Sequence, residues 1–263
     1  MDKSSIIGLL LGFIAVGVGM VLKGVSPSVL ANPAAILIIL VGTLAAICIA
    51  FPLSELKRIP KLFKIIFGKE EKESLLDVIH LFSELAVVAR RDGLLALEAK
   101  LAEVEDPFLK SGLTLAIDGQ APEYIRDVLD EEIAAMEDRH NSGALIFSQA
   151  GTYAPTLGVL GAVIGLIAAL GNLSDTNLLG HAIAAAFVAT LLGIFTGYVL
   201  WHPFATKLKR KSQAEIKRKE IMIEGILSIL EGQPPRLIES KLAVYLPIKE
   251  RSLINSAGEK LDE

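Results

Sequence analysis

The sequence has few of the residues from which catalytic and metal sites are built. Of its 263 residues one is a cysteine, Cys48, and four are histidines that lie far apart in the chain. One cysteine forms no disulfide framework within the chain, and no His/Cys metal spacing, Gly-rich phosphate loop or nucleophile triad is present. The sequence therefore predicts neither an enzyme nor a bound cofactor, and Cys48 is expected to be a small core residue of a membrane span.

Charged residues are absent from four long stretches of the chain. Asp, Glu, Lys and Arg do not occur in 4–22, 24–54, 140–174 or 176–206, although they make up 21% of all residues. Each stretch accommodates about 20 residues, enough for a helix that crosses a hydrocarbon core of about 30 Å. With a mean hydropathy of +0.53, the sequence predicts an all-α, polytopic membrane protein whose four spans lie near 5–22, 34–52, 151–171 and 182–202.

Basic residues are missing from the link between the third and fourth spans, NLSDTNLL. They cluster instead after the second span and after the fourth, at Lys57, Arg58, Lys61, Lys64, Lys69 and Lys72 and at Lys207, Lys209, Arg210, Lys211, Lys217, Arg218 and Lys219. By the positive-inside rule, both termini and the 53–147 region are cytoplasmic, and the two short links face outward. The net charge of −4 argues against a nucleic-acid partner.

The same pattern divides the chain into four regions. These are a transmembrane hairpin, a cytoplasmic helical domain, a second hairpin, and C-terminal cytoplasmic helices with a polar tail, at 1–52, 53–147, 148–203 and 204–263. Within the cytoplasmic regions, apolar periodicity and Gly or Pro breaks predict helix ends near 92, 106 and 118. A helix is expected from Pro122 through 147 towards the third span, and a basic helix from 207 to 230 before the GQPP break.

Bulky residues are missing from one face of the third span. Small residues recur there in alternating steps of four and three, at Gly151, Pro155, Gly158, Ala162, Gly165 and Ala169. Such a face lets another helix backbone approach closely. Either it receives the helix of a partner, together with Thr190 and small residues of the fourth span, or it only holds the bundle together; the pattern favours neither. Pro155 and Thr156 add a freed carbonyl and a hydroxyl within the hydrocarbon.

An ionisable side chain at membrane depth is also missing from the four spans, apart from the flanking His181 and His202. A protein that itself moves ions through a bilayer normally has such a group. If ions pass, the carboxylate that binds them is therefore supplied by a partner.

Three segments carry a resemblance to a known family: TYAPTLGVLGAVIGLIAAL in the third span, HAIAAAFVATLLGIFTGYVLWHPF in the fourth, and ARRDGLLALE at 89–98. With the four-span layout, they resemble the A subunit of the bacterial flagellar stator, the MotA/PomA family. The resemblance implies a proton-channel component and torque generator in the bacterial inner membrane, in which five A subunits surround two B subunits. It implies as partners a single-span B subunit of the MotB type, which supplies the membrane aspartate, a rotor switch protein of the FliG type, and membrane lipids.

The resemblance also implies roles for residues in the third and fourth spans. Pro155 matches a family proline near the partner's aspartate, Pro203 matches a second proline at the end of the fourth span, and Thr190 matches a channel-facing threonine. Thr156 and Ala162 complete the expected channel lining. Without the resemblance, Pro155 is a helix-start proline and Thr190 a residue that hydrogen-bonds to the preceding helical turn.

Charged residues of the 53–147 region match the family's rotor-binding positions. Arg90 and Glu98, eight positions apart across the break at Asp92-Gly93, match its charged pair, and Glu132 matches a further acidic position. Arg91 is adjacent and shares or replaces the role of Arg90. By themselves these residues fit a solvated helix face, since surface charges usually contribute little to stability.

A threonine is missing where sodium-driven members resembling this chain tend to have one, at Ala162. A partly dehydrated Na⁺ needs oxygen ligands, so the apolar Ala162 favours a proton as the transported ion. Two other interpretations remain. A TolQ/ExbB-type energy transducer shares the proton-channel logic but has a three-span layout, and a non-conducting membrane scaffold needs no partner carboxylate.

Overall fold

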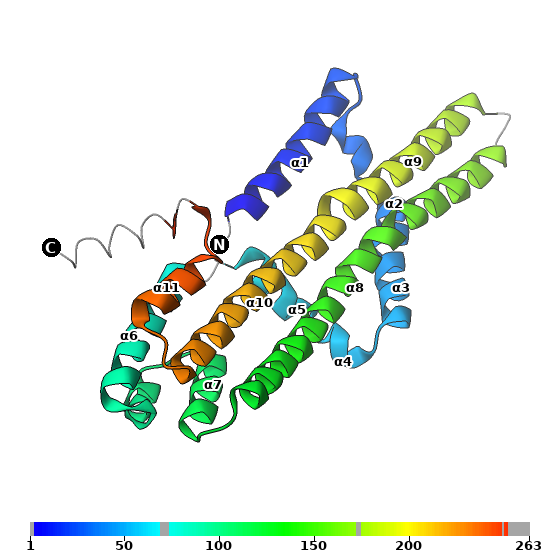
Figure 1. The fold of residues 1–263 in the computed structure, drawn as a ribbon. Coiled ribbons are helices and arrows are strands. Elements are labelled where there is room, and N and C mark those ends of the chain that lie inside the picture. The colour runs from blue at the N-terminus through cyan, green and yellow to red at the C-terminus, as the bar shows by residue number, and fades with distance from the viewer. Residues whose placement is uncertain (1–2, 69–73, 172–174, 249, 252–263) are drawn as a thin grey trace. The chain divides into compact units, whose positions relative to one another are not determined.

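The computed structural model describes residues 3–68, 74–171, 175–248, 250 and 251, and every regular element within these ranges is a helix (Figure 1). Four helical stretches are long and apolar enough to cross a membrane, so the predicted all-α, four-span fold is confirmed. The predicted polar tail after 251, and Lys69 and Lys72 of the first basic cluster, lie outside the described residues. The elements are α1 (Lys3–Leu22), η1 (Pro27–Leu30), α2 (Pro33–Ile36), η2 (Leu37–Val41), α3 (Gly42–Ala50), α4 (Leu53–Leu56), α5 (Ile59–Phe67), α6 (Leu75–Asp92), η3 (Leu94–Ala102), α7 (Pro107–Ile117), α8 (Pro122–Leu170), α9 (Thr176–Phe195), η4 (Thr196–Trp201), α10 (His202–Leu230) and α11 (Pro235–Ala243).

Side-chain caps and turn residues set the helix limits. The Ser74 hydroxyl and the Asp77 carboxylate form a capping box at the start of α6, and the Asp106 carboxylate accepts the first N–H groups of α7. Gly93 separates α6 from η3 and has a φ of 86°. Residues with a side chain rarely adopt this backbone conformation, so glycine is favoured at this turn. The predicted helix end at Asp92-Gly93 is thus confirmed, and the following helix is of the 3₁₀ type.

The chain forms two compact units. The first, called here the membrane unit, comprises Met1–Glu70 and Arg139–Lys211, and the second, called the head unit, comprises Glu71–Asp138 and Ser212–Glu263. Each unit is therefore assembled from two separate stretches of sequence, and α8 and α10 contribute to both.

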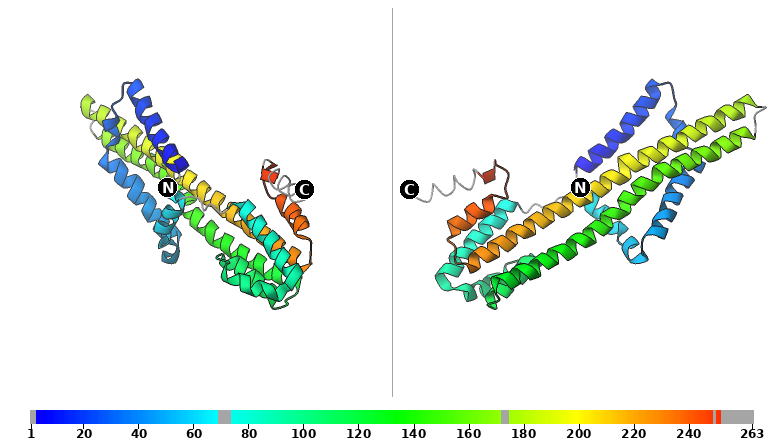
Figure 2. Two further views of the ribbon diagram at one scale, coloured as in Figure 1. Left: turned by 90° about the vertical axis from the view of Figure 1, so that its left-hand side faces the viewer. Right: turned by 45° about the vertical axis from the view of Figure 1, so that its right-hand side comes forward.

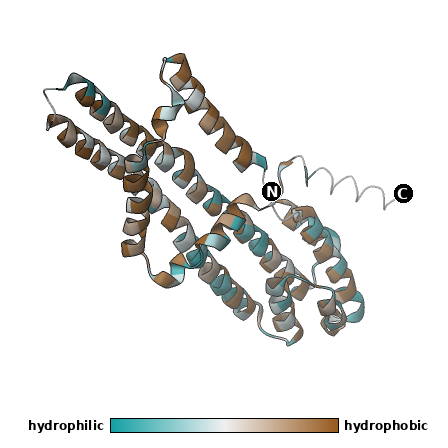
Figure 3. Ribbon diagram, turned by 180° about the vertical axis from the view of Figure 1, so that it is seen from behind, coloured by the Kyte–Doolittle hydropathy of each residue, from teal (hydrophilic) through white to brown (hydrophobic). Residues whose placement is uncertain are grey.

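The membrane unit leaves most of its apolar side chains uncovered. Its first span, α1, has no buried residue. Most residues of this span and of α9 are hydrophobic, as the brown colour in Figure 3 shows. In the second span, Ala35, Ile39 and Ile47 are buried, whereas the neighbouring Cys48 is exposed. The expectation of a buried Cys48 is therefore wrong, because its position on the helix lies beside the packed face rather than on it.

The head unit has a continuous hydrophobic core. Helices α6, α7, α8, α10 and α11, together with η3, contribute fully buried side chains that include Phe82, Leu97, Leu129 and Ile226. The ring of Phe82 lies against Gly225, where a Cβ atom would be 2.5 Å from a ring carbon. The packing is therefore tight enough to require glycine at that point.

Candidate functional site

In the membrane unit, α8 and α9 lie side by side in opposite directions (Figure 2) and touch through their backbones. A Cβ atom on Gly158 would lie 2.8 Å from the Ala189 carbonyl oxygen, and one on Gly193 would lie 2.8 Å from the Ala154 carbonyl oxygen. Such distances exclude any side chain at either glycine. The two residues set the closest approach of these helices, as small residues do at membrane helix interfaces.

Pro155 marks the next contact along this pair of helices. It lies inside α8 and is half-buried, and because proline has no N–H, the Gly151 carbonyl lacks its usual helical donor. A Cβ atom on Gly197 would be 2.8 Å from that carbonyl oxygen and 2.7 Å from Cγ of Pro155. Gly197 therefore packs directly on the freed carbonyl, where a Cα–H group makes a weak polar contact.

Gly197 belongs to a π-helical segment, η4, that the sequence analysis did not predict. The His202 N–H donates to the Gly197 carbonyl, five residues back, and Pro203 follows as the second residue of α10. A second π segment, η2, lies in the second span. Such segments are rare and occur often at functional sites. The signals in the sequence were Pro203 and the glycine opposite Pro155, but neither specifies a π segment.

The hydroxyls of the candidate channel residues bond to their own helices. The Thr156 hydroxyl donates to the Thr152 carbonyl at 3.2 Å, and the Thr190 hydroxyl donates to the Ala186 carbonyl at 3.3 Å. Thr156 is exposed, whereas Ala162 and Thr190 are half-buried. The hydroxyl oxygens of Thr156 and Thr190 retain lone pairs, so each can still accept a further hydrogen bond.

The antiparallel register places Ala162 and Thr190 at one level of the membrane unit. A Cβ atom on Gly161, next to Ala162, would lie 3.1 Å from Cβ of Ala189, next to Thr190. The structure thus brings Pro155 close to η4 and places Ala162 level with Thr190. The glycines of the small face pack against the fourth span, so for these residues the structure favours a role in packing the bundle. Pro155, Thr156 and Ala162 are at least partly exposed and are accessible to a partner helix.

Two buried polar atoms beside the π segments have no hydrogen-bond partner among the described residues. They are the hydroxyl of Thr43, two residues after the end of η2, and the indole Nε1 of Trp201, the last residue of η4. Buried polar groups are normally satisfied. These atoms mark polar positions within an otherwise apolar packing region.

In the head unit, the candidate rotor-binding residues lie on three elements. Arg90 and Arg91 lie in the last turn of α6, Glu98 lies in η3 and Glu132 in α8, and all four are exposed. Arg91 pairs with Asp92 at 2.7 Å, and this hydrogen bond lowers the pKa of the Asp92 carboxyl. Within the described ranges, Arg90, Glu98 and Glu132 form no ion pair. Their charges are therefore available to another protein, while Arg91 has an internal partner.

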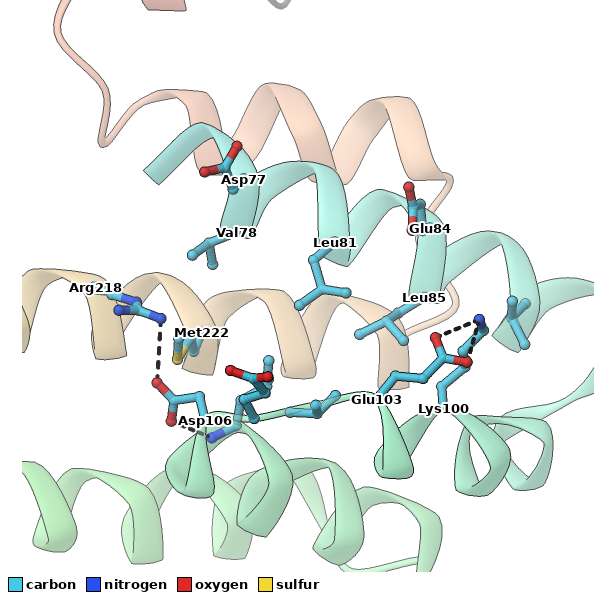
Figure 4. A pocket seen from close by; sticks show the side chains of 14 residues that line it. Asp77, Val78, Leu81, Glu84, Leu85, Lys100, Glu103, Asp106, Arg218 and Met222 are labelled. Carbon is cyan, nitrogen blue, oxygen red and sulfur yellow. Dashed lines mark hydrogen bonds and ion pairs between the residues drawn. The ribbon is translucent and has the colours of Figure 1, made fainter. Parts of the chain in front are cut away.

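A pocket of about 310 Å³ opens between α6, η3, α7 and α10 (Figure 4). Its apolar lining includes Leu81, Leu85 and Met222. The rim bears the Lys100–Glu103 pair at 2.8 Å and the Arg218–Asp106 pair at 3.5 Å. The acidic residues on this rim outnumber the basic ones, so the pocket lies in a negative part of the head unit.

An ion-pair network joins α8, α10 and α11 in the head unit. Glu224 accepts hydrogen bonds from Arg126 at 2.6 Å and pairs with Lys241 at 2.9 Å. Burial alone raises the pKa of the Glu224 carboxyl, but the hydrogen bonds from Arg126 and Lys241 outweigh it and hold this pKa below its ordinary value. The network therefore fixes the C-terminal helix to the core by charge as well as by apolar contacts.

Two parts of the sequence match known protein families. Residues 100–221 match the MotA/TolQ/ExbB proton channel family, and residues 6–93 match the N-terminal region of motility protein A. Together these matches cover nearly all of the four spans and the residues singled out in them, and also Arg90, Arg91 and Glu132, whereas Glu98 lies between the two matched stretches.

The chain is also similar to individual relatives over nearly its whole length. It is 63% identical to Motility protein A of Bacillus subtilis (strain 168), with 98% of this chain and 96% of the relative covered. It is 32% identical to Chemotaxis protein PomA of Vibrio alginolyticus, with 96% and 98% covered.

Two solved structures have the same fold. The flagellar MotAB stator complex from Bacillus subtilis matches with a TM-score of 0.91 at 64% identity, over 95% of this chain and 98% of that chain. The MotAB structure from C. jejuni matches with a TM-score of 0.90 at 33% identity, over 94% and 97%.

Proposed function

This chain belongs to the MotA/TolQ/ExbB proton channel family as a stator subunit of the flagellar motor, and from that premise we propose that its third and fourth spans form the wall of a proton pathway. Its family makes it a component of an ion-driven motor rather than an enzyme. The carboxylate that carries the proton would come from a single-span B subunit, because the related solved structures are MotAB complexes.

One observation carries this proposal. The spans that hold Pro155 and Thr190 have no Asp, Glu, Lys or Arg from 140 to 174 or from 176 to 206, yet Pro155 frees a carbonyl against which Gly197 packs. A wall of this kind is polar enough to guide a proton carrier and has no strong charge that would trap it. The ion-binding group must then belong to another chain.

The proposed mechanism uses the low polarity of this wall. A proton from outside neutralises the partner's aspartate, whose pKa is raised at membrane depth because the charged form is costly there. The neutral helix then shifts along the face formed by Pro155, Thr156, Ala162 and Thr190. Repeated steps turn a ring of A subunits, five in the expected assembly, about the B subunits.

Torque would pass to the rotor through the exposed charges of the head unit. Arg90, Glu98 and Glu132 have no internal ion-pair partner among the described residues, which supports a role in contacting a FliG-type rotor protein. The basic clusters after the second and fourth spans support a cytoplasmic location for the head unit and both termini. Pro203 ends the fourth span beside η4 and would couple movement in the span to α10.

We infer a proton as the transported ion because Ala162 offers no oxygen ligand. In the test, torque is measured in tethered cells over a range of sodium concentrations, before and after Ala162→Thr. Torque in the parent protein is expected to be independent of sodium. Sodium dependence already present in the parent would overturn the assignment.

The experiment that tests the whole proposal is proton uptake into liposomes under an imposed membrane potential. We expect uptake by this chain with an unplugged B subunit, no uptake by this chain alone, and loss of uptake when the partner's membrane aspartate is replaced by Asn. Thr190→Val or Pro155→Ala should reduce uptake. Uptake by the chain alone would contradict the proposal, and unchanged uptake in both variants would support a wall made of other residues.

A TolQ/ExbB-type transducer is the second candidate within the same family. The match of residues 6–93 to motility protein A and the four spans favour the stator. A non-conducting scaffold would give no uptake in any arm of the liposome experiment.

A further inference from the structure

Six basic side chains stand exposed beside one hydrophobic cluster of the membrane unit. They are Lys57, Arg58, Lys61, Lys64, Lys209 and Arg210, called here the basic belt. None of them forms an ion pair with a described residue, and within 53–68 and 200–214 the sequence has one acidic residue, Glu55. In a chain whose net charge is −4, this excess of positive charge is local and is not neutralised by the chain itself.

The packing of α5 shows why its basic face is left outward. Its apolar residues Leu62, Phe63, Ile66 and Phe67 join a cluster with residues of α8 and α10. The rings of Phe63 and Phe147 are 5.2 Å apart, and those of Phe67 and Phe204 are 5.6 Å apart. The apolar face of α5 is thus largely used inside the chain, and the outward side of the helix bears Lys61 and Lys64 of the belt beside the exposed Ile65.

Two lysines of α10 locate the belt at the membrane surface. Nζ of Lys207 donates to the hydroxyls of Ser4, at 3.2 Å, and Ser5, at 2.5 Å, where span α1 begins. Nζ of Lys211 donates to the Ile65 carbonyl at 2.7 Å, near the end of α5. The end of α5 and the basic run of α10 therefore lie level with the start of a membrane span, where hydrocarbon gives way to headgroups.

We propose that the basic belt binds the phosphate groups of acidic phospholipids and that these lipids complete the surface of α5. Lys207 and Lys211 are not part of the site, because their ammonium groups are used within the chain. Basic clusters directly beside a membrane span attract anionic lipids, and each cation near such a surface contributes a binding factor of about five. This inference rests on the membrane location of the chain and is independent of the ion pathway.

The test measures which lipids the purified assembly retains. The full-length chain with its B subunit is incubated in detergent with equal amounts of phosphatidylglycerol and phosphatidylcholine, and retained lipid is counted by native mass spectrometry. We expect phosphatidylglycerol to be strongly enriched. Inorganic phosphate at the concentration of the lipid should not displace it; displacement by free phosphate would overturn the assignment to lipid.

Four double variants distinguish binding by the belt from an effect of the protein's overall charge. Lys61→Gln with Lys64→Gln, or Lys209→Gln with Arg210→Gln, should lower the enrichment by roughly 25-fold, since two cations are lost. Lys61→Arg with Lys64→Arg should restore it. The matched control, Lys110→Gln with Lys217→Gln, removes two exposed cations of the head unit and should leave the enrichment unchanged. The proposal would be overturned if the belt variants to Gln kept the same enrichment of phosphatidylglycerol over phosphatidylcholine, or if the control lost as much of this enrichment as they do.

Discussion

The two units of this molecule use opposite means to hold helices together. The head unit buries large side chains such as Phe82 and Leu97 completely and adds ion pairs such as that of Arg126 with Glu224. The membrane unit brings α8 and α9 together where side chains are absent, at Gly158 and Gly193, and leaves most of its large apolar residues uncovered. Water drives apolar burial in the head unit; in lipid that drive is absent, and close backbone contact replaces it.

The largest expected effect follows from apolar burial in the head unit. Leu85 is 2% exposed and Leu22, in α1, is 81% exposed. Leu85→Ala should destabilise the protein by about 2–5 kcal/mol through lost burial and a cavity, whereas Leu22→Ala should change stability by less than about 0.5 kcal/mol. Thermal unfolding of the purified complex in one detergent compares the two. Equal losses would show that α1 is packed as tightly as the head unit.

The second effect is expected when a glycine at a helix contact of the membrane unit is replaced by a larger residue. Gly193→Ala places a methyl group 2.8 Å from Cα of Gly158, and overpacking of this kind costs about 1–3 kcal/mol. The control is Gly17→Ala, since a Cβ atom there meets nothing within 4 Å, and it should gain up to about 1 kcal/mol of helix propensity. The measurement is the thermal unfolding midpoint of each variant. An unchanged midpoint in Gly193→Ala would contradict the close backbone contact between the two helices.

The third effect concerns the charges that stabilise only the head unit. The Glu224 pKa is lower in the folded protein than its ordinary value of 4.5, so the folded state binds fewer protons than the unfolded state. The stability this group contributes is therefore present above pH 4.5 and is lost as the pH falls through the lowered pKa. Glu224→Gln should lower stability at neutral pH and flatten its acid dependence. A parallel shift of the whole pH profile would argue against the network.

The smallest effect on stability is expected at the proposed rotor surface. Arg90 and Glu98 are exposed, so Arg90→Glu or Glu98→Lys should change stability by less than about 0.5 kcal/mol. Motility on soft agar should nevertheless fall sharply while proton uptake is retained. Arg91→Glu should have a weaker effect, because Arg91 already pairs with Asp92, and Lys110→Glu serves as a distant control. Loss of proton uptake in Arg90→Glu would contradict the separation of channel and rotor contacts.

The sequence was sufficient to predict the elements that depend on composition. Runs without charge located the four spans, and Gly93 and Pro122 marked helix limits that the structure has as predicted. These signals are local, because span length and turn conformation are properties of a few adjacent residues.

Features that depend on neighbours could not be predicted in the same way. The π segment at Thr196–Trp201 contains Gly197, which packs against Pro155 of another helix, and a contact with a residue so distant in the sequence cannot be read from the segment itself. The small face of the third span left two interpretations open, and only the register of Gly158 with Gly193 shows which residues face the fourth span. The roles of Pro155, Ala162 and Thr190 towards a partner remain predictions.

The hydrogen bonds from Lys207 to Ser4 and Ser5 connect residues that are about 200 positions apart in the chain. At a synthesis rate of about 5–20 residues per second, roughly 10–40 s pass before the lysine that holds the start of α1 has been made. During that time the first span must stay in the bilayer without this contact. Insertion of α1 and its final attachment are therefore separate events in the biogenesis of the protein, and the attachment can occur only after the fourth span has been synthesised.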